Sequence, residues 1–172
     1  MASRLHVDEF VDGGGLQLAT ELGAISGDHV GHSSEAARQS ASDSGVMQTF
    51  LPGTPYILGH DLETPLRQCI ENNWPFSLAT DFNPNCRTLS MPFVGSLATH
   101  RLGLSPIEAL VAVTRNPATT LLNSTPGQVA GSIREGGPAD LLILDSQYID
   151  AWCQMPGDNP IYRTIKSGDI VN

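Results

Sequence analysis

Apolar and polar positions alternate along the chain in a pattern that favours parallel βα units. Short runs rich in apolar and β-branched residues are typical of buried strands, and the stretches between them have the apolar spacing of amphipathic helices. The predicted strands are 4–7, 24–29, 46–51 and 76–80, and the predicted helices between them are 16–22, 34–42 and 64–73. Strands that alternate with helices in this way predict an α/β fold with a parallel sheet.

The pattern changes after Asp81. An irregular segment at 83–86 leads to two predicted helices, 90–101 and 105 to about 115, and Ser105-Pro106-Ile107-Glu108 has the form of a capping box with proline at the first helical position. A connection rich in Ser, Thr, Pro and Gly follows at 123–131, and 139–145 and 161–171 are predicted strands of a separate, smaller sheet. We therefore expect two domains, 1–130 and 131–172.

Composition narrows the function classes. The chain has 172 residues, 40% of them hydrophobic, which is enough for a core but short of the roughly 250 residues of a complete α/β barrel. A net charge of -9 disfavours nucleic acid and anionic membranes as partners. Three widely spaced cysteines argue against a disulfide framework, and no apolar run has the length of a signal-peptide core or a membrane span. These features predict a cytoplasmic protein.

Polar side chains stand where three of the predicted strands end. His6, His29 and Asp81 each come at the end of a strand and are followed at once by loop-like sequence. Taken singly, such a histidine is more often a packed structural residue, and an aspartate beside a turn is usually a cap. Together they lie where α/β barrels carry their active sites, and imidazole and carboxylate are suitable ligands for zinc or iron.

Four strings, in order along the chain, resemble the imidazolonepropionases of the amidohydrolase superfamily. They are Leu-His-Val-Asp-Glu-Phe-Val-Asp at 5–12, Gly-Asp-His at 27–29, Leu-Pro-Gly-Thr at 51–54 and Ala-Thr-Asp-Phe-Asn-Pro at 79–84. The segments 105–118 and 131–141 resemble amidohydrolases more generally. The resemblance implies the C-terminal half of a metal-dependent TIM (β/α)8 barrel, followed by a few C-terminal strands of an accessory β-sandwich.

The same resemblance assigns roles to five residues. It implies that His6 and Asp81 bind one divalent metal, zinc or iron, and that Asp81 also takes a proton from the attacking water. It implies that Glu9 bonds the imidazolone ring and moves protons, that His29 polarises the ring carbonyl, and that Asn83 lies near the substrate. For Asn83 an Asx turn before Pro84 is an equal alternative. His32, His60 and His100 receive no role.

The chain also departs from the family pattern. A complete imidazolonepropionase carries a His-x-His pair on its first barrel strand, and this sequence has no His-x-His. We therefore expect the C-terminal part of such a hydrolase, incomplete or inactive by itself, which opens the ring of 4-imidazolone-5-propanoate to N-formimidoyl-L-glutamate in histidine degradation. The expected partner is a second copy in a homodimer or the N-terminal half of a split enzyme. The alternatives are a cytosine or guanine deaminase-like amidohydrolase and a non-catalytic remnant.

Overall fold

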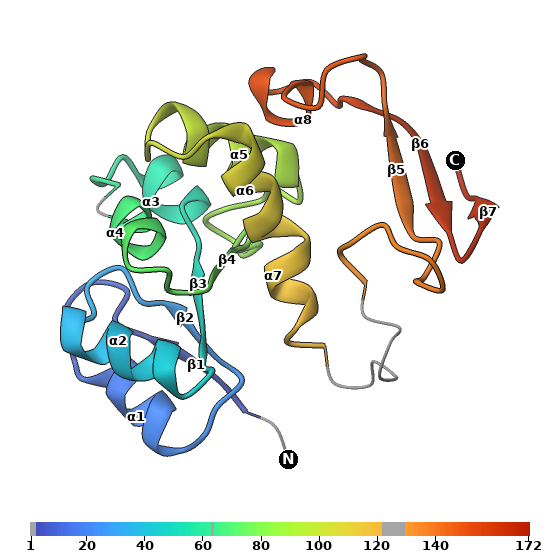
Figure 1. Cartoon of the computed structure of the whole chain (residues 1–172). Helices are drawn as coiled ribbons and strands as arrows, with labels where there is room; N and C mark the ends of the chain where they lie inside the picture. Colours follow the sequence, from blue (N-terminus) through green and yellow to red (C-terminus); the bar gives the residue numbers. More distant parts are fainter. Residues whose placement is uncertain (1–2, 63, 122–129) are drawn as a thin grey trace.

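The computed structural model describes residues 3–62, 64–121 and 130–172. Its larger sheet is parallel, as predicted from the sequence. The strand order is β1-β2-β3-β4 (Figure 1). The strands are β1 (Arg4–Val7), β2 (Ser26–His29), β3 (Met47–Phe50) and β4 (Phe76–Leu78). The connections contain α1 (Gly15–Glu21), α2 (Glu35–Asp43), α3 (Gly53–Leu58) and α4 (Leu66–Glu71). Since consecutive strands are neighbours, the carboxyl ends of all four strands meet along one rim of the sheet.

Helices follow the fourth strand, and a second sheet comes last in the chain. The helices are α5 (Met91–His100), α6 (Pro106–Val113) and α7 (Arg115–Ala118), with α8 (Ala151–Gln154) between two strands of the second sheet. That antiparallel sheet consists of β5 (Leu141–Leu144), β6 (Ile161–Lys166) and β7 (Asp169–Ile170). The capping box is confirmed: the Ser105 amide donates to Glu108 Oε2 at 2.8 Å, and the Glu108 amide donates to Ser105 Oγ at 3.2 Å.

The two sheets fall on either side of residue 130, which was the boundary predicted from the sequence; the division into two domains remains a prediction. Most of the connection predicted at 123–131 lies outside the described residues. Within the described part of the chain, no helix is both long and apolar enough to cross a membrane.

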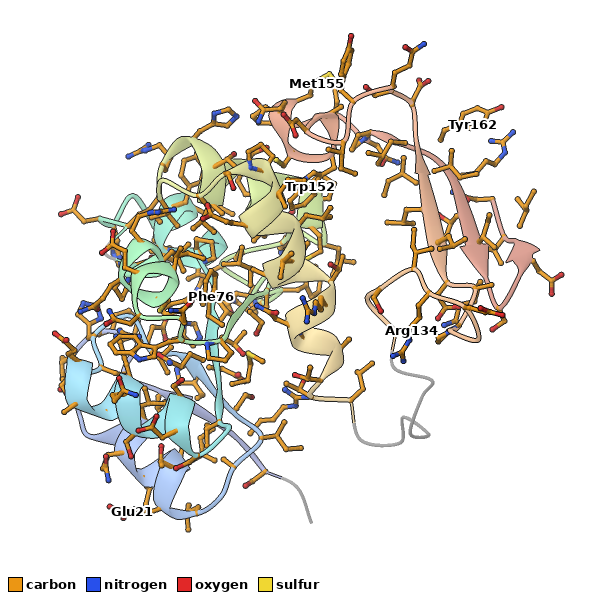
Figure 2. All side chains as sticks on the ribbon, viewed as in Figure 1. Glu21, Phe76, Arg134, Trp152, Met155 and Tyr162 are labelled. Carbon is orange, nitrogen blue, oxygen red and sulfur yellow. The ribbon has the colours of Figure 1, made fainter. Side chains whose placement is uncertain are left out.

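The core lies between the helices and one face of the parallel sheet. Leu16 of α1, Phe50 of β3 and Phe76 of β4 are at most 2% exposed. Figure 2 labels Phe76 among the side chains of this layer. The core extends to α8, because the buried ring of Trp152 packs on α5 beside Gly95. The Trp152 indole donates to the Pro106 carbonyl at 3.0 Å. Helix α8 therefore anchors the C-terminal part of the chain to α5 and α6.

The opposite face of the sheet is polar near β1 and β2. Register pairs Arg4 with Ser26 and His6 with Asp28, so these four side chains share one face. Arg4 Nη1 donates to Ser26 Oγ at 3.2 Å, and Ser26 Oγ donates to Asp28 Oδ1 at 2.8 Å. In a closed barrel this face would line the lumen, so the chain presents half of a hydrogen-bonded lumen.

Candidate active site

Four of the five predicted site residues come together at the carboxyl rim of the sheet. His6 lies in β1, Glu9 follows that strand, His29 ends β2 and Asp81 follows β4. Parallel pairing sets Val7 opposite His29, which brings the loop after β1 beside the end of β2. The potential ligand atoms of His6, Glu9 and His29 all lie within 4.8 Å of one another. The rim thus gathers side chains that are up to 75 positions apart in sequence.

The side chains form a continuous line of contacts. Glu9 lies between the two histidines, with Oε2 3.0 Å from His6 Nε2 and Oε1 3.8 Å from His29 Nδ1. His29 Nε2 in turn lies 3.9 Å from Asp81 Oδ1, and the two imidazole rings have centroids 4.3 Å apart. The His6 side chain is 67% exposed, whereas that of His29 is 8% exposed. The line therefore runs from a solvent-facing histidine to a buried one.

Asn83 and Thr54 shape the loop that carries Asp81. The Thr54 hydroxyl donates to Asp81 Oδ2, while Asn83 Nδ2 donates to the Asp81 carbonyl at 2.8 Å and to Thr54 Oγ1 at 3.2 Å. Asn83 Oδ1 accepts from the amides of Asn85 at 2.8 Å and Cys86 at 3.2 Å. Asn83 thus forms the Asx turn that was its alternative reading; contact with a substrate remains a prediction. Thr54, which had no predicted role, belongs to the Leu-Pro-Gly-Thr string at 51–54.

The strand ends adopt left-handed backbone conformations. Asp8, His29, Val30 and Asp81 have φ values of 51°, 76°, 48° and 57°. Aspartate tolerates this region, but a β-branched valine there is an outlier, and residues held in such regions cost of order 1–3 kcal/mol each. These sharp turns bend the chain at the rim immediately beside the clustered side chains. Backbone strain of this kind gathers at functional sites.

A buried carboxylate that the sequence did not single out holds the first of these turns. Asp8 Oδ1 accepts from the amides of Gly13 at 3.1 Å and Gly15 at 2.9 Å, and Oδ2 accepts from the Leu16 amide at 3.0 Å and the Ser33 hydroxyl at 2.6 Å. Burial alone would raise the pKa of Asp8, but these hydrogen bonds outweigh it and lower the pKa. Asp8 therefore fixes the loop that presents Glu9.

Burial also controls the protonation of His29. Removal from water lowers the pKa of His29, and the nearby carboxylates of Glu9 and Asp81 raise it by less, so the pKa lies below its usual value. The neutral imidazole is therefore favoured near neutral pH. A neutral ring has one donor and one acceptor nitrogen, and both nitrogens face carboxylates here.

An open hollow of about 340 Å³ adjoins this cluster. Glu9 and His29 form one side, and its other lining residues include Phe50, Thr54, His32 and His60. The two additional histidines lie on loops, and neither belongs to the strand-end pattern from which the site was predicted. A small cyclic molecule in this hollow would meet Glu9 and His29 together, while His6 remains open to solvent.

The donor set fits a divalent transition metal. Imidazole nitrogen and carboxylate oxygen are ligands for zinc and iron, and His6, Glu9 and His29 bring three such atoms together. Asp81 adds a fourth group through its 3.9 Å approach to His29. Its other oxygen is held by Thr54, so the carboxylate has a fixed orientation toward the rim.

Sequence comparison finds relatives of the family that the sequence motifs resemble. Curated relatives include the imidazolonepropionases of Haloarcula marismortui, at 36% identity over 100% of this chain and 40% of the relative, and of Geobacillus thermodenitrificans, at 37% over 99% and 40%. The imidazolonepropionase of Halobacterium salinarum is 34% identical over 99% of this chain and 41% of the relative. The chain thus spans about 40% of the length of these relatives.

Solved structures confirm the predicted fold. An adenosine deaminase from Xanthomonas campestris with bound zinc superimposes with a TM-score of 0.77 at 17% identity, covering 99% of this chain and 45% of that one. An ochratoxinase from A. niger gives 0.74 at 20% identity, covering 98% and 41%. The family model described as amidohydrolase family matches residues 20–171. The chain, with its half-barrel of parallel strands, belongs to the amidohydrolase family.

Proposed function

We propose that this chain is the C-terminal catalytic part of an imidazolonepropionase-type hydrolase, which opens the ring of 4-imidazolone-5-propanoate to N-formimidoyl-L-glutamate in histidine degradation. The observation that carries the proposal is the convergence of His6, Glu9, His29 and Asp81 on one rim. The identity of 34–37% to imidazolonepropionases over nearly the whole chain supports this substrate.

Members of the amidohydrolase family depend on a metal. We assign its binding to His6, whose ring nitrogen lies in the cluster with Glu9 and His29, and to Asp81, which approaches that cluster at His29. Zinc and iron both suit these ligands. A divalent ion held there would supply an activated water as nucleophile near neutral pH. His6 Nε2 lies 3.0 Å from Glu9 Oε2, so His6 would hold an ion through this nitrogen only where the Glu9 carboxylate, which also lines the hollow, leaves the nitrogen free.

The remaining residues can perform the ring opening. Asp81 stands ready to take the proton of the attacking water, with Thr54 fixing its second oxygen. His29, a donor at a largely buried position, would stabilise the negative charge that develops on the carbonyl oxygen. As water adds to the carbonyl carbon, the ring carbon–nitrogen bond breaks, and the departing nitrogen receives a proton. Glu9, beside the hollow, is placed to bond the ring and move that proton.

The sheet has an open edge at β1, where backbone groups can pair with a further strand. The Ser3 and Val7 carbonyls accept from the amides of Ile25 and Val30, just before and just after β2. By strand alternation, the backbone groups of Arg4 and His6 therefore point to the open edge of the sheet. Apolar side chains at the rim, Phe10 and Phe82 among them, are 65% and 59% exposed. We propose that an N-terminal half, which supplies the missing strands and the His-x-His ligands, covers these groups, and that completed barrels pair as a homodimer. Three free cysteines fit a reducing cytoplasm.

The test is hydrolysis by a reconstituted pair. The chain is co-expressed with the N-terminal part of the Geobacillus thermodenitrificans imidazolonepropionase, and loss of the imidazolone is followed together with release of ammonia. We expect ring opening without ammonia, and at least a 100-fold loss of rate in Asp81→Asn, the scale of a removed catalytic acid or base. Asp158→Asn, an exposed aspartate outside the site, is the matched control.

Two outcomes would contradict the proposal. Ammonia release from a cyclic amine in place of ring opening would assign the chain to a deaminase-like reaction. A folded pair that binds no metal and turns over no imidazolone would mark a non-catalytic remnant. Equal rates for Asp81→Asn and Asp158→Asn would remove Asp81 from the catalytic set.

A further inference from the structure

A guanidinium lies buried behind the turn that carries His29. Arg38 of α2 is 1% exposed, and its Nη2 donates to the carbonyls of Val30 and, at 3.0 Å, Gly31. Its Nη1 donates to Gln48 Oε1 at 3.2 Å, and the guanidinium carbon lies 5.4 Å from the centre of the Phe50 ring. Among the ion pairs of the described residues, none includes Arg38.

Burial of a cation that forms no ion pair with a carboxylate costs desolvation free energy. Its direct contacts are two carbonyl dipoles, one amide oxygen and an aromatic face, and the carboxylates of Asp8 and Asp12 act on the charge without forming an ion pair with it. A neutral apolar residue would avoid the desolvation cost, so packing alone does not explain the arginine. What a guanidinium provides is a rigid planar fork of several donors, which can bond two carbonyls of one turn at once.

The turn that receives these bonds is the strained one. His29 and Val30 are consecutive non-glycine residues with φ of 76° and 48°. A relaxed, extended backbone at these positions would send the His29 side chain to the opposite side of the chain, because successive extended residues alternate. The turn keeps its shape only if neighbouring contacts outweigh a cost of order 1–3 kcal/mol for each residue.

Contacts from two sides hold this turn. Toward β1, the Val30 amide donates to the Val7 carbonyl at 3.1 Å, and the His32 amide donates to the Asp8 carbonyl at 3.2 Å. Within the turn, the Ser33 amide donates to the Val30 carbonyl at 3.3 Å. Toward α2, Arg38 bonds the carbonyls of both Val30 and Gly31. The side chain that bonds both carbonyls of the turn thus comes from the helix behind it, and it does not line the hollow.

We propose that Arg38 is a positioning residue for His29: its guanidinium holds the left-handed Val30–Gly31 turn and thereby keeps the His29 ring between Glu9 and Asp81. The catalytic consequence rests on the role assigned to His29 in the proposed function. The positioning itself concerns only the folded chain, and it is measurable without any activity.

The experiment uses the 172-residue chain with isotope-labelled histidine rings, which gives five ring signals. Because the His6 and His29 ring centroids lie 4.3 Å apart, a cross-ring Overhauser contact reports the position of His29. In Arg38→Met we expect this contact to be lost while the far-ultraviolet dichroism of the folded chain is retained. Gln48→Met, which removes another buried polar group bonded to Arg38, is the matched control and should keep the contact.

A second pair of variants separates positioning from core stability. Val30→Gly removes the side chain that makes the left-handed turn costly, so Arg38→Met combined with Val30→Gly should regain part of the contact. If Arg38→Met does not fold, Arg38→Lys takes its place; its single ammonium cannot bond both carbonyls as the fork does, so the contact should weaken. An unchanged contact in either Arg38 variant, or an equal loss in Gln48→Met, would overturn the proposal. A reconstituted pair without activity would leave this result untouched.

Discussion

The packing of α8 on α5 depends on the absence of a side chain at Gly95. A Cβ at this position would lie 2.3 Å from Trp152 Cη2, 2.6 Å from Cζ3 and 2.9 Å from Cys153 Cβ. The ring cannot move freely, because Trp152 is 5% exposed and its indole bonds the Pro106 carbonyl at 3.0 Å. Gly95→Ala must therefore displace α8 or strain α5.

Two opposing effects set the change in the free energy of unfolding that Gly95→Ala causes. Alanine in place of glycine inside a helix stabilises it by roughly 1 kcal/mol. Overpacking a close contact costs about 1–3 kcal/mol, and full release of the tryptophan would cost about 3–5 kcal/mol. A shift of α8 costs less free energy than release of Trp152, so we expect the shift. We therefore expect Gly95→Ala to lower the free energy of unfolding by up to about 2 kcal/mol.

Urea unfolding followed by far-ultraviolet dichroism measures this change. A red shift of the tryptophan emission maximum relative to the unmodified chain, to which Trp74 also contributes, reports greater exposure of Trp152. The background Trp152→Leu supplies the control, because a smaller side chain leaves room for the new methyl group. There, Gly95→Ala should be neutral or stabilising. Stabilisation by Gly95→Ala in the unmodified chain would refute the docking of α8 on α5.

Three further predictions follow from single residues. Glu108→Gln should destabilise the chain by up to about 1 kcal/mol at pH 7 and by much less at pH 3. Hydrogen bonding by the Ser105 amide lowers the pKa of Glu108, so the stability that Glu108 contributes is present above its unfolded pKa and is lost as the pH falls through its folded pKa. Equal shifts of the urea midpoint at both pH values would contradict this. Burial raises the pKa of Cys69 to about 11, so iodoacetamide at pH 8 should modify it only in urea, and mass spectrometry showing rapid modification of the native chain would disprove its burial. Asp8→Asn should cost about 1–3 kcal/mol in urea unfolding, because an amide nitrogen would face backbone donors; an unchanged midpoint would exclude Asp8 as the anchor of its loop.

Much of the fold was predictable because its apolar pattern is regular. In β1, Leu5 and Val7 face the helices and alternate with Arg4 and His6, so the predicted and observed bounds agree. Helix α3 was not predicted, because the Leu-Pro-Gly-Thr-Pro string that surrounds its first turn has the composition of a loop. Helix α8 has only four residues, too few for a helical period, and forms where Trp152 finds the space beside Gly95.

The site was predictable only in part. His6, His29 and Asp81 stand at strand ends, which is a local signal, and Glu9 came from the resemblance of its surrounding string. Thr54 and Arg38 were missed, because their roles depend on contacts with Asp81 and with the turn at Val30, and neither contact has a local signature. In the sequence, Arg38 is one charged residue of a polar helix; only the fold shows it buried.

The most direct test of the central claim is the metal content of the reconstituted pair. The chain and an imidazolonepropionase N-terminal half are purified together, and bound zinc and iron are counted by elemental analysis. We predict about one divalent ion per pair, lost in both His6→Ala and Asp81→Ala and retained in Asp158→Ala. A pair that assembles and binds its ion equally well without His6 and Asp81 would contradict the assignment of this rim as the metal site.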